Sequence, residues 1–200
     1  MPNMRAKNEQ SWALYPSLDQ DVRRLLLQDM LFFHFHHADD EQHLVEDYDT
    51  NIMGRFICHN ASCKSKGWSS KRVAITIRMY SDRTYNARVN FQRCRACKKL
   101  SKPELDSSYA ERIAYRIKKW YGVRQLLPPP YSGGNDPKEP HKIELCEGCK
   151  AGRCIEKCPQ GVSLCRACGL LLVTRDGVEQ CPDMECAGIN NIGGDTKPWW

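Results

Sequence analysis

The sequence predicts a small α+β fold, because it combines one strand pattern, two helix patterns and a large set of paired cysteines. Residues 73–91 alternate apolar and polar side chains on both sides of a short polar turn, as β-strands do. Residues 18–35 and 105–120 carry apolar side chains at the spacing of a helix. All twelve cysteines of the 200-residue chain lie in close pairs. We therefore expect a small domain built on a β-hairpin with a packing helix and stabilised through its cysteines.

The alternating segment predicts an antiparallel hairpin with one apolar and one mixed, largely polar face. Its two strands are joined by Ser81-Asp82-Arg83-Thr84. The apolar face comprises Val73, Ile75, Ile77, Met79, Tyr85, Ala87, Val89 and Phe91. The opposite face comprises Ala74, Thr76, Arg78, Tyr80, Asn86, Arg88, Asn90 and Gln92. We expect a half-buried hairpin, with the apolar face in the core and the other face in solvent.

An N-terminal helix is predicted from about Leu18 to about Phe35. Ser17-Leu18-Asp19-Gln20 has the form of a capping box, and the acidic residue suits the positive end of a helix dipole. The helix runs into the acidic stretch 38–46, which has few apolar residues and is predicted to be a linker. The histidines near the helix end do not share one helical face, so we interpret them as partly solvated rings. They are His34, His36, His37 and His43.

A second helix is predicted to begin at one of two capping boxes, Ser101-Lys102-Pro103-Glu104 or Ser108-Tyr109-Ala110-Glu111. Gly122 is a plausible C-terminal stop. The apolar stripe of this helix comprises Leu105, Tyr109, Ile113, Ile117 and Trp120. Another face carries the basic residues Arg112, Arg116 and Lys119. We interpret the segment as a core helix with a solvated basic face.

The cysteine pairs have the spacing of zinc knuckles, in which two thiolates converge on one tetrahedral ion. The pairs are Cys58/Cys63, Cys94/Cys97, Cys146/Cys149, Cys154/Cys158, Cys165/Cys168 and Cys181/Cys186. The first ten residues lack the apolar run of a signal peptide, so we expect a reducing compartment and metal ligands rather than disulfides. Because two knuckles complete a site, the six pairs predict about three Zn²⁺ per chain.

The order of the pairs predicts how the ligands are grouped. Folding the hairpin brings the knuckles at its two ends together, which predicts a first site of Cys58, Cys63, Cys94 and Cys97. A second site is expected from His141, Cys146, Cys149 and Cys154. A third is expected from Cys165, Cys168, Cys181 and Cys186, which flank a short hairpin turning at Asp176-Gly177 as in a zinc ribbon. Cys158 is an alternative to His141 or Cys154 in the second site.

The charge distribution divides the chain into three parts. Residues 1–50 carry 4 basic and 10 acidic side chains, residues 51–157 carry 23 and 9, and residues 158–200 carry 3 and 5. We therefore predict an N-terminal amphipathic helix with an acidic linker (1–50), a basic zinc-binding domain (51–157) and a zinc-ribbon-like C-terminal module (158–200). Residues 12–37 are expected to dock on the basic domain, because an apolar helix face does not stay solvated and opposite charges attract.

The middle segment contains several short motifs in a fixed order. They are Arg55-Phe56-Ile57-Cys58, Gly67-Trp68-Ser69-Ser70, Tyr85-Asn86-Ala87-Arg88-Val89, Gln92-Arg93-Cys94-Arg95-Ala96-Cys97, His141, Cys146-Glu147-Gly148-Cys149 and Gly152-Arg153-Cys154. With them, residues 54–154 resemble the 3CxxC-type zinc-finger domain, and most of all its fungal branch. The receptor-transporting and zygote arrest proteins share this domain. The resemblance implies that the matched cysteines and His141 bind zinc.

The function predicted first is a zinc-binding adaptor that recognises a protein or RNA partner. The basic middle segment suits an anionic partner. Arg78, Tyr80, Arg88 and Asn90 on the polar hairpin face, together with an exposed aromatic such as Trp68, suit single-stranded RNA. The resemblance offers an alternative, a trafficking escort for membrane proteins. The longest apolar runs are too short to span a membrane.

We do not expect an enzyme or a small-molecule substrate, because the ligands fill every predicted zinc site and a catalytic zinc needs an open position. The zinc deaminase pattern is also not met, since His141-Lys142-Ile143-Glu144 is one residue too long. We expect an intracellular protein, in the cytoplasm or alternatively in the nucleus. The sequence does not determine the oligomeric state.

Overall fold

The computed structural model describes residues 9–124, 141–154, 173–175 and 178–180. The chain divides into two compact units, Met1–Lys157 and Cys158–Trp200. In the second unit, strands β9 (Val173–Arg175) and β10 (Val178–Gln180) pair antiparallel, with Val178 opposite Arg175. This strand pair lies where the sequence predicts a short hairpin. The other helices and strands that the structure describes all belong to the first unit.

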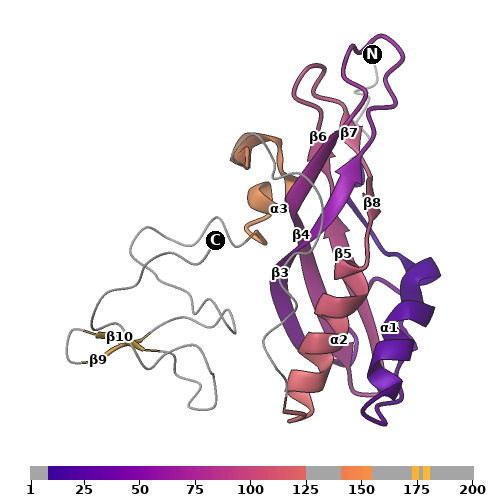
Figure 1. The fold of residues 1–200 in the computed structure, drawn as a ribbon, viewed down its shortest axis with the longest axis vertical. Coiled ribbons are helices and arrows are strands. Elements are labelled where there is room, and N and C mark those ends of the chain that lie inside the picture. The colour runs from indigo at the N-terminus through magenta and orange to yellow at the C-terminus, as the bar shows by residue number, and fades with distance from the viewer. Residues whose placement is uncertain (1–8, 125–140, 155–172, 176–177, 181–200) are drawn as a thin grey trace, which may run out of the picture. The chain divides into compact units, whose positions relative to one another are not determined.

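The first unit is built on a six-stranded sheet with the order β1-β5-β4-β3-β8, in which β2 also pairs with β5 (Figure 1). Its strands are β1 (Trp12–Ala13), β2 (His34–Phe35), β3 (Leu44–Phe56), β4 (Trp68–Tyr80), β5 (Thr84–Asn90) and β8 (Pro103–Leu105). The pair β6 (Gln92–Arg93) and β7 (Leu100–Ser101) forms a separate small sheet. The helices are α1 (Asp19–Leu27), α2 (Ser108–Trp120) and the short α3 (Glu147–Lys150), with 3₁₀ turns at Pro16–Leu18 and Ile143–Leu145.

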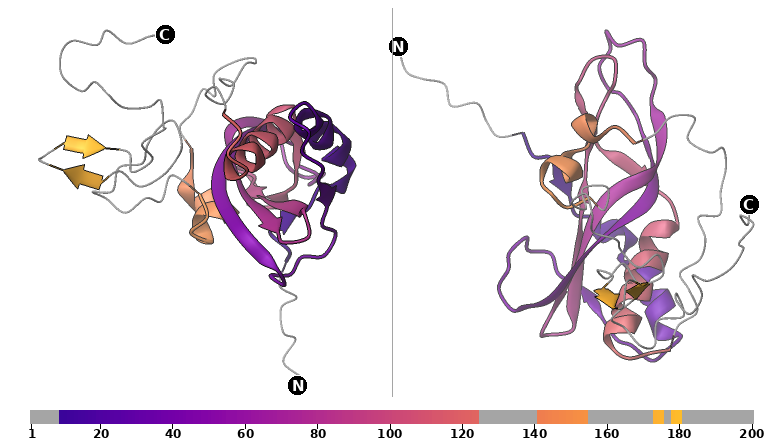
Figure 2. Two further views of the ribbon diagram at one scale, coloured as in Figure 1. Left: turned by 90° about the horizontal axis from the view of Figure 1, so that it is seen from below. Right: turned by 90° about the vertical axis from the view of Figure 1, so that its left-hand side faces the viewer.

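Strands β4 and β5 lie antiparallel in the middle of the sheet, and their apolar face forms the core. Ile75 lies opposite Val89 and Ile77 opposite Ala87, and all four side chains are fully buried. Helices α1 and α2 cover this face, and the sheet curves around them (Figure 2, left). Helix α2 contributes Tyr109, Ile113 and Ile117 to the core, as its predicted apolar stripe requires. Within the described residues, no helix is both long and apolar enough to cross a membrane.

The N-terminal helix is shorter than the sequence predicts. Helix α1 ends at Leu27, and Met30 takes a left-handed backbone conformation with φ of 56°. The chain then forms β2, which pairs parallel with β5, so the histidines expected at a helix end lie on and after a strand. The predicted capping box does not form, because its serine lies in a 3₁₀ turn and no side chain caps the helix. The helix nevertheless docks as expected, with Val22 and Leu26 fully buried in the core.

The acidic segment is not a linker. From Leu44 the chain enters β3, a strand of 13 residues that pairs with β4 along almost its whole length. The domain boundary expected at residue 50 therefore falls inside a strand. The sequence of β3 does not show the regular alternation of a strand, for two reasons. Two of its exposed positions carry the acidic residues Glu46 and Asp47, and the pairing register shifts twice, between residues 44 and 46 and between residues 52 and 54.

The polar face of the hairpin is buried, contrary to the expectation that it meets solvent. Arg78 is 2% exposed, and its Nη2 donates to Asp39 Oδ1 at 2.5 Å while its Nε donates to Asn86 Oδ1 at 2.8 Å. Arg88 Nε donates to the same oxygen of Asp39 at 2.6 Å. Asp39, between β2 and β3, thus supplies a negative charge to both arginines of the hairpin face.

Other polar contacts also join residues 36–43 to the polar face of the hairpin. The Tyr80 hydroxyl donates to the backbone oxygen of Asp40 at 3.0 Å, and the His36 ring stacks on the Tyr80 ring at 3.9 Å between centroids. Trp68, expected to be exposed, is half-buried. Its ring stacks on Phe56 at 5.0 Å, and its Nε1 donates to Gln92 Oε1 at 3.1 Å.

The basic side of helix α2 is also partly buried. The Arg116 guanidinium carbon lies 3.1 Å from the centroid of the Tyr48 ring, and Lys118 Nζ lies 2.6 Å from Asp29 Oδ2. Both residues are less than 10% exposed. They join α2 to β3 and to the segment after α1, so these charges hold the fold together rather than facing solvent.

We expect Asp39→Asn to lower the free energy of unfolding by about 3 kcal/mol, because the buried Arg78 guanidinium loses its charged partner. The control Asp21→Asn removes the exposed ion pair with Arg24, 3.0 Å long, and is expected to cost no more than about 0.5 kcal/mol. Urea denaturation at a fixed zinc concentration measures both. Equal, small losses in the two variants would show that Asp39 has no such role.

Candidate metal centres

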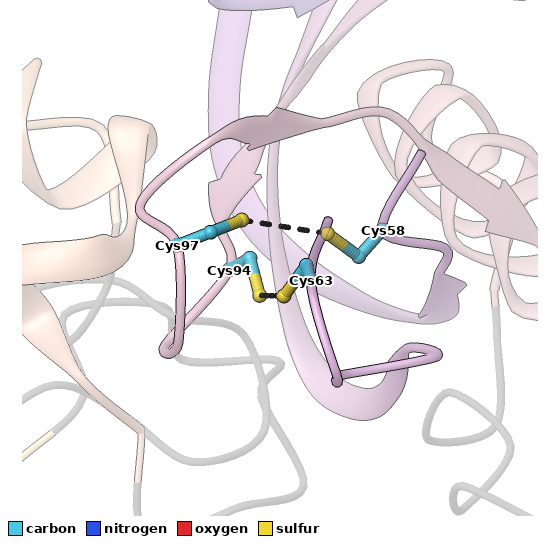
Figure 3. Close-up of side chains that lie close together, drawn as sticks. All are labelled: Cys58, Cys63, Cys94 and Cys97. Atoms are coloured by element: carbon cyan, nitrogen blue, oxygen red, sulfur yellow. Dashed lines mark hydrogen bonds between the residues drawn. The ribbon is translucent and has the colours of Figure 1, made fainter. Parts of the chain in front are cut away.

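The first candidate centre lies where the chain leaves β3 and where it turns between β6 and β7. The Sγ atoms of Cys58, Cys63, Cys94 and Cys97 all lie within 4.8 Å of one another. Cys58 Sγ is 3.5 Å from Cys97 Sγ, and Cys63 Sγ is 3.7 Å from Cys94 Sγ (Figure 3). Only Cys94 is fully buried, and the other three are half-buried. The two knuckles therefore meet in one cluster that lies close to the surface.

Backbone geometry brings these knuckles together. The second knuckle is a tight turn in which Cys94 N donates to Lys99 O at 2.9 Å and Lys98 N donates to Cys94 O at 2.8 Å. The first knuckle returns to the sheet through Gly67, whose φ is 140°. A Cβ at Gly67 would lie 2.3 Å from the backbone oxygen of Phe56, so only glycine fits this close approach.

The second candidate centre combines one imidazole and three thiols. The donor atoms of His141, Cys146, Cys149 and Cys154 all lie within 4.8 Å of one another. His141 Nε2 is 3.3 Å from Cys149 Sγ and 3.8 Å from Cys154 Sγ. The three cysteines are buried, and they pack with Ala74 of β4 in a small apolar cluster of their own. This centre is therefore much less exposed than the first.

Helix α3 holds the second centre against the outer face of the hairpin. Cys146 forms a β-bridge with Gln92, and Glu147 N donates to Phe91 O at 3.0 Å. A Cβ at Gly148 would lie 2.4 Å from the Ala74 Cβ, so the absence of a side chain lets the helix sit directly on the sheet. The Glu147 carboxylate accepts a hydrogen bond from Arg93 Nε at 2.7 Å. The second centre thus covers the part of the hairpin face that residues 36–43 leave open.

The clustered thiols alter one another's ionisation. A hydrogen bond from the Asn60 side chain, with the backbone N–H of Lys99, lowers the pKa of Cys97 to about 6. A hydrogen bond with Cys146, with further help from His141, lowers the pKa of Cys154 to about 5. The same contact and burial raise the pKa of Cys146. Some thiols of each cluster thus ionise easily, but a cation is needed before all of them carry a charge together.

Both donor sets fit zinc. Tetrahedral zinc is held by four thiolates or by three thiolates and one imidazole, and these are the two sets that the fold assembles. Each set provides four converging donors within one small volume. Zinc bound there would fix segments that are distant in sequence and would neutralise the thiolates, which is a structural role.

The comparisons with known proteins agree with this chemistry. The family model of the 3CxxC zinc-binding domain matches residues 51–152. The chain belongs to this family. Neither the curated proteins nor the solved structures contain a significant match to the chain. The matched range includes seven of the eight donors, since it ends just before Cys154.

The structure brings together eight of the twelve predicted ligands, in the two groups named above. The other four, Cys165, Cys168, Cys181 and Cys186, lie outside the described residues, as does Cys158. Two zinc sites are therefore supported, and the third remains a prediction. Sequence reasoning did not identify the residues that support the ligands, such as Asn60 beside Cys97 and Asn51, whose Oδ1 lies 3.8 Å from Cys154 Sγ. Their polar side chains carry no spacing signal.

We expect Cys94→Ser to remove zinc from the first centre and to lower the thermal transition temperature. The buried Cys94 thiol lies against Cys63 of the other knuckle, and zinc bound between them would join the two. The matched control is Ser62→Ala, an exposed position in the same loop as Cys63. Zinc content after dialysis against a chelator and thermal denaturation are the measurements. The structural role of the first centre is wrong if Cys94→Ser retains both the zinc content and the thermal transition of the unmodified protein.

We expect Gly148→Ala to lower zinc content at the second centre by displacing helix α3, because the new methyl group would overlap Ala74 of the sheet. The control Gly152→Ala adds the same methyl group in open space, although its positive φ carries a small strain. The double variant Gly148→Ala/Ala74→Gly should restore much of the lost zinc, since it removes the opposing methyl group. Failure of this rescue would contradict the proposed contact as the cause.

Proposed function

We propose that this protein is a zinc-stabilised adaptor that recognises a macromolecular partner, RNA or protein, and that it is not an enzyme. The observation that carries the proposal is the completeness of the two donor sets. Each centre supplies four converging protein ligands, and the second is buried beneath α3. A catalytic zinc ordinarily has three protein ligands and keeps one position for water or substrate.

The positions of the centres support the same proposal. The first joins the end of β3 to the turn between β6 and β7, and the second attaches α3 to the hairpin. Each therefore holds a structural junction, which is what a small domain with limited apolar mass requires. What remains for function is the surface that this scaffold presents.

The partner surface cannot be the hairpin face that the sequence first suggested. Arg78, Tyr80 and Asn90 are all less than 10% exposed, and Arg88 is engaged by Asp39. An RNA or protein partner must therefore contact other parts of the domain. The alternative of an escort for membrane proteins rests on the family resemblance alone, and within the described residues no surface favours it over an adaptor.

Cobalt substitution tests whether the centres are closed. We expect Co²⁺ in both described centres to give the absorption of tetrahedral thiolate coordination, and we expect added cyanide or imidazole to leave the spectrum unchanged. An unchanged spectrum indicates that every position is filled by the protein. A spectral shift on ligand addition would demonstrate an open position and would contradict the structural role of that centre.

Capture of partners by the tagged full chain, with and without nuclease, distinguishes the two partner classes. Partners lost on nuclease treatment indicate recognition through nucleic acid, whereas retained partners indicate direct protein contact. Cys94→Ser serves as the control for capture by misfolded protein. If the unmodified chain captures nothing beyond this control, the adaptor proposal is wrong.

A further inference from the structure

Exposed cations gather on the two loops that carry the first metal centre. We call residues 58–67 and 94–99 the knuckle loops. Both lie at the same end of the sheet, beside β6 and β7 (Figure 1). Their exposed basic residues are Lys64, Lys66, Arg95, Lys98 and Lys99. Neither loop contains an acidic residue. Zinc with four thiolates carries a net charge of only about −2, so the five cations outweigh it.

Carboxylates on neighbouring elements lie near arginines outside these loops. Glu9 Oε2 and Glu147 Oε1 lie 3.6 and 2.7 Å from the Arg93 guanidinium. Glu104 of β8 lies opposite Arg55 of β3 in the sheet. Among the residues that the structure describes, no carboxylate forms an ion pair with the four lysines of the knuckle loops. Their charge is therefore available to a partner.

The backbone beneath these lysines is ordered before any partner binds. The 94–99 turn is closed by the two hydrogen bonds between Cys94 and residues 98 and 99, and the other loop is closed by Cys63 N donating to Asn60 O at 2.8 Å. Lys98 is held in the left-handed region with φ of 61°. A partner would thus have to immobilise only side chains, which reduces the entropic cost of binding.

The knuckle loops can contact phosphates but offer little for reading bases. Their one aromatic ring is the exposed imidazole of His59; they contain no Phe, Tyr or Trp, and the adjacent Trp68 is already stacked on Phe56. Stacking and hydrogen bonding to base edges supply sequence recognition, whereas lysine acts on phosphate as a flexible point charge. The repeated spacing of charge along a nucleic acid strand suits several lysines on two adjoining loops.

We propose that the knuckle loops bind the phosphodiester backbone of nucleic acid without base-specific contacts. This inference rests on the adaptor function proposed above and names its partner. Zinc has an indirect role in it, because coordination sets the positions of the two loops. RNA and DNA share the recognised chemistry, so both belong in the test.

Fluorescence anisotropy with the full zinc-loaded chain tests the proposal. The probes are labelled oligouridine, oligoadenine and mixed-sequence RNA of one length, and the mixed sequence as single-stranded DNA. We expect all four to bind at low salt with similar affinities. The triple variant Lys64→Gln/Lys66→Gln/Lys99→Gln is expected to bind about 10-fold more weakly or worse, and its salt dependence (log K against log salt concentration) should become shallower by about 2.

Two control variants test whether the loss of affinity depends on the position and the charge of the lysines rather than on a change in folding. Arg23→Gln/Arg24→Gln/Arg83→Gln removes the same charge from exposed residues elsewhere, and it is expected to stay within about twofold of the unmodified affinity because salt screens distant charges. Lys64→Arg/Lys66→Arg/Lys99→Arg keeps the charge and is expected to bind like the unmodified protein. Zinc content is measured for every variant.

Three results would overturn the inference. They are equal weakening by the two glutamine triples, a strong preference for one base sequence, and no binding by the unmodified chain at low salt. A fourth result, preference between RNA and DNA at equal sequence, would identify contacts beyond the shared backbone and would overturn the inference as well. The adaptor proposal can survive the failure of this inference. It would do so if the cobalt spectra stay unchanged on ligand addition and partners are still captured after nuclease treatment.

Discussion

The constraint on which the fold depends is that the β4–β5 hairpin is buried on both faces. One face is apolar, and helices α1 and α2 cover it in the ordinary way. The other face carries arginine and asparagine, which cannot be buried without partners. The chain meets this requirement with two different covers. Asp39 forms ion pairs with Arg78 and Arg88 near one end, and the second metal centre packs on Ala74 near the other.

The same constraint explains what the sequence could and could not predict. The hairpin strands, helix α2 and the two ligand sets follow local rules of alternation, helical spacing and cysteine spacing, so the existence of each was predicted. Their bounds were predicted less well, since β4 begins at Trp68 and Leu105 lies in β8 rather than in the helix. Strand β3 and the short extent of α1 were not predicted. The acidic run that contains Asp39 and Asp47 resembles a solvated linker, because its partners, the arginines of the hairpin and Arg153, lie far away in sequence. Only the folded chain shows that these charges are paired.

The two metal centres differ in burial and therefore in what they contribute. The second is enclosed between α3 and the sheet, so it acts as part of the core. The first lies close to the surface, and exposed lysines follow its ligands Cys63 and Cys97 in the sequence. The segment from Phe91 to Cys97 connects them, since Phe91 and Gln92 contact the second centre's helix while Cys94 and Cys97 belong to the first. We therefore expect loss of an ion from either centre to disturb this shared segment.

The position of α3 late in the chain has a consequence for synthesis on the ribosome. Asp39 is synthesised before the hairpin arginines with which it forms ion pairs, so this partner is present when β4 and β5 form. The other cover is not, because Cys154 is the last donor of its centre to be made. Until then Ala74 and Asn90 have no helix above them, and the nascent domain exposes surface that is buried in the finished protein. We expect this exposure to end once Cys154 has been made and the second centre can bind zinc.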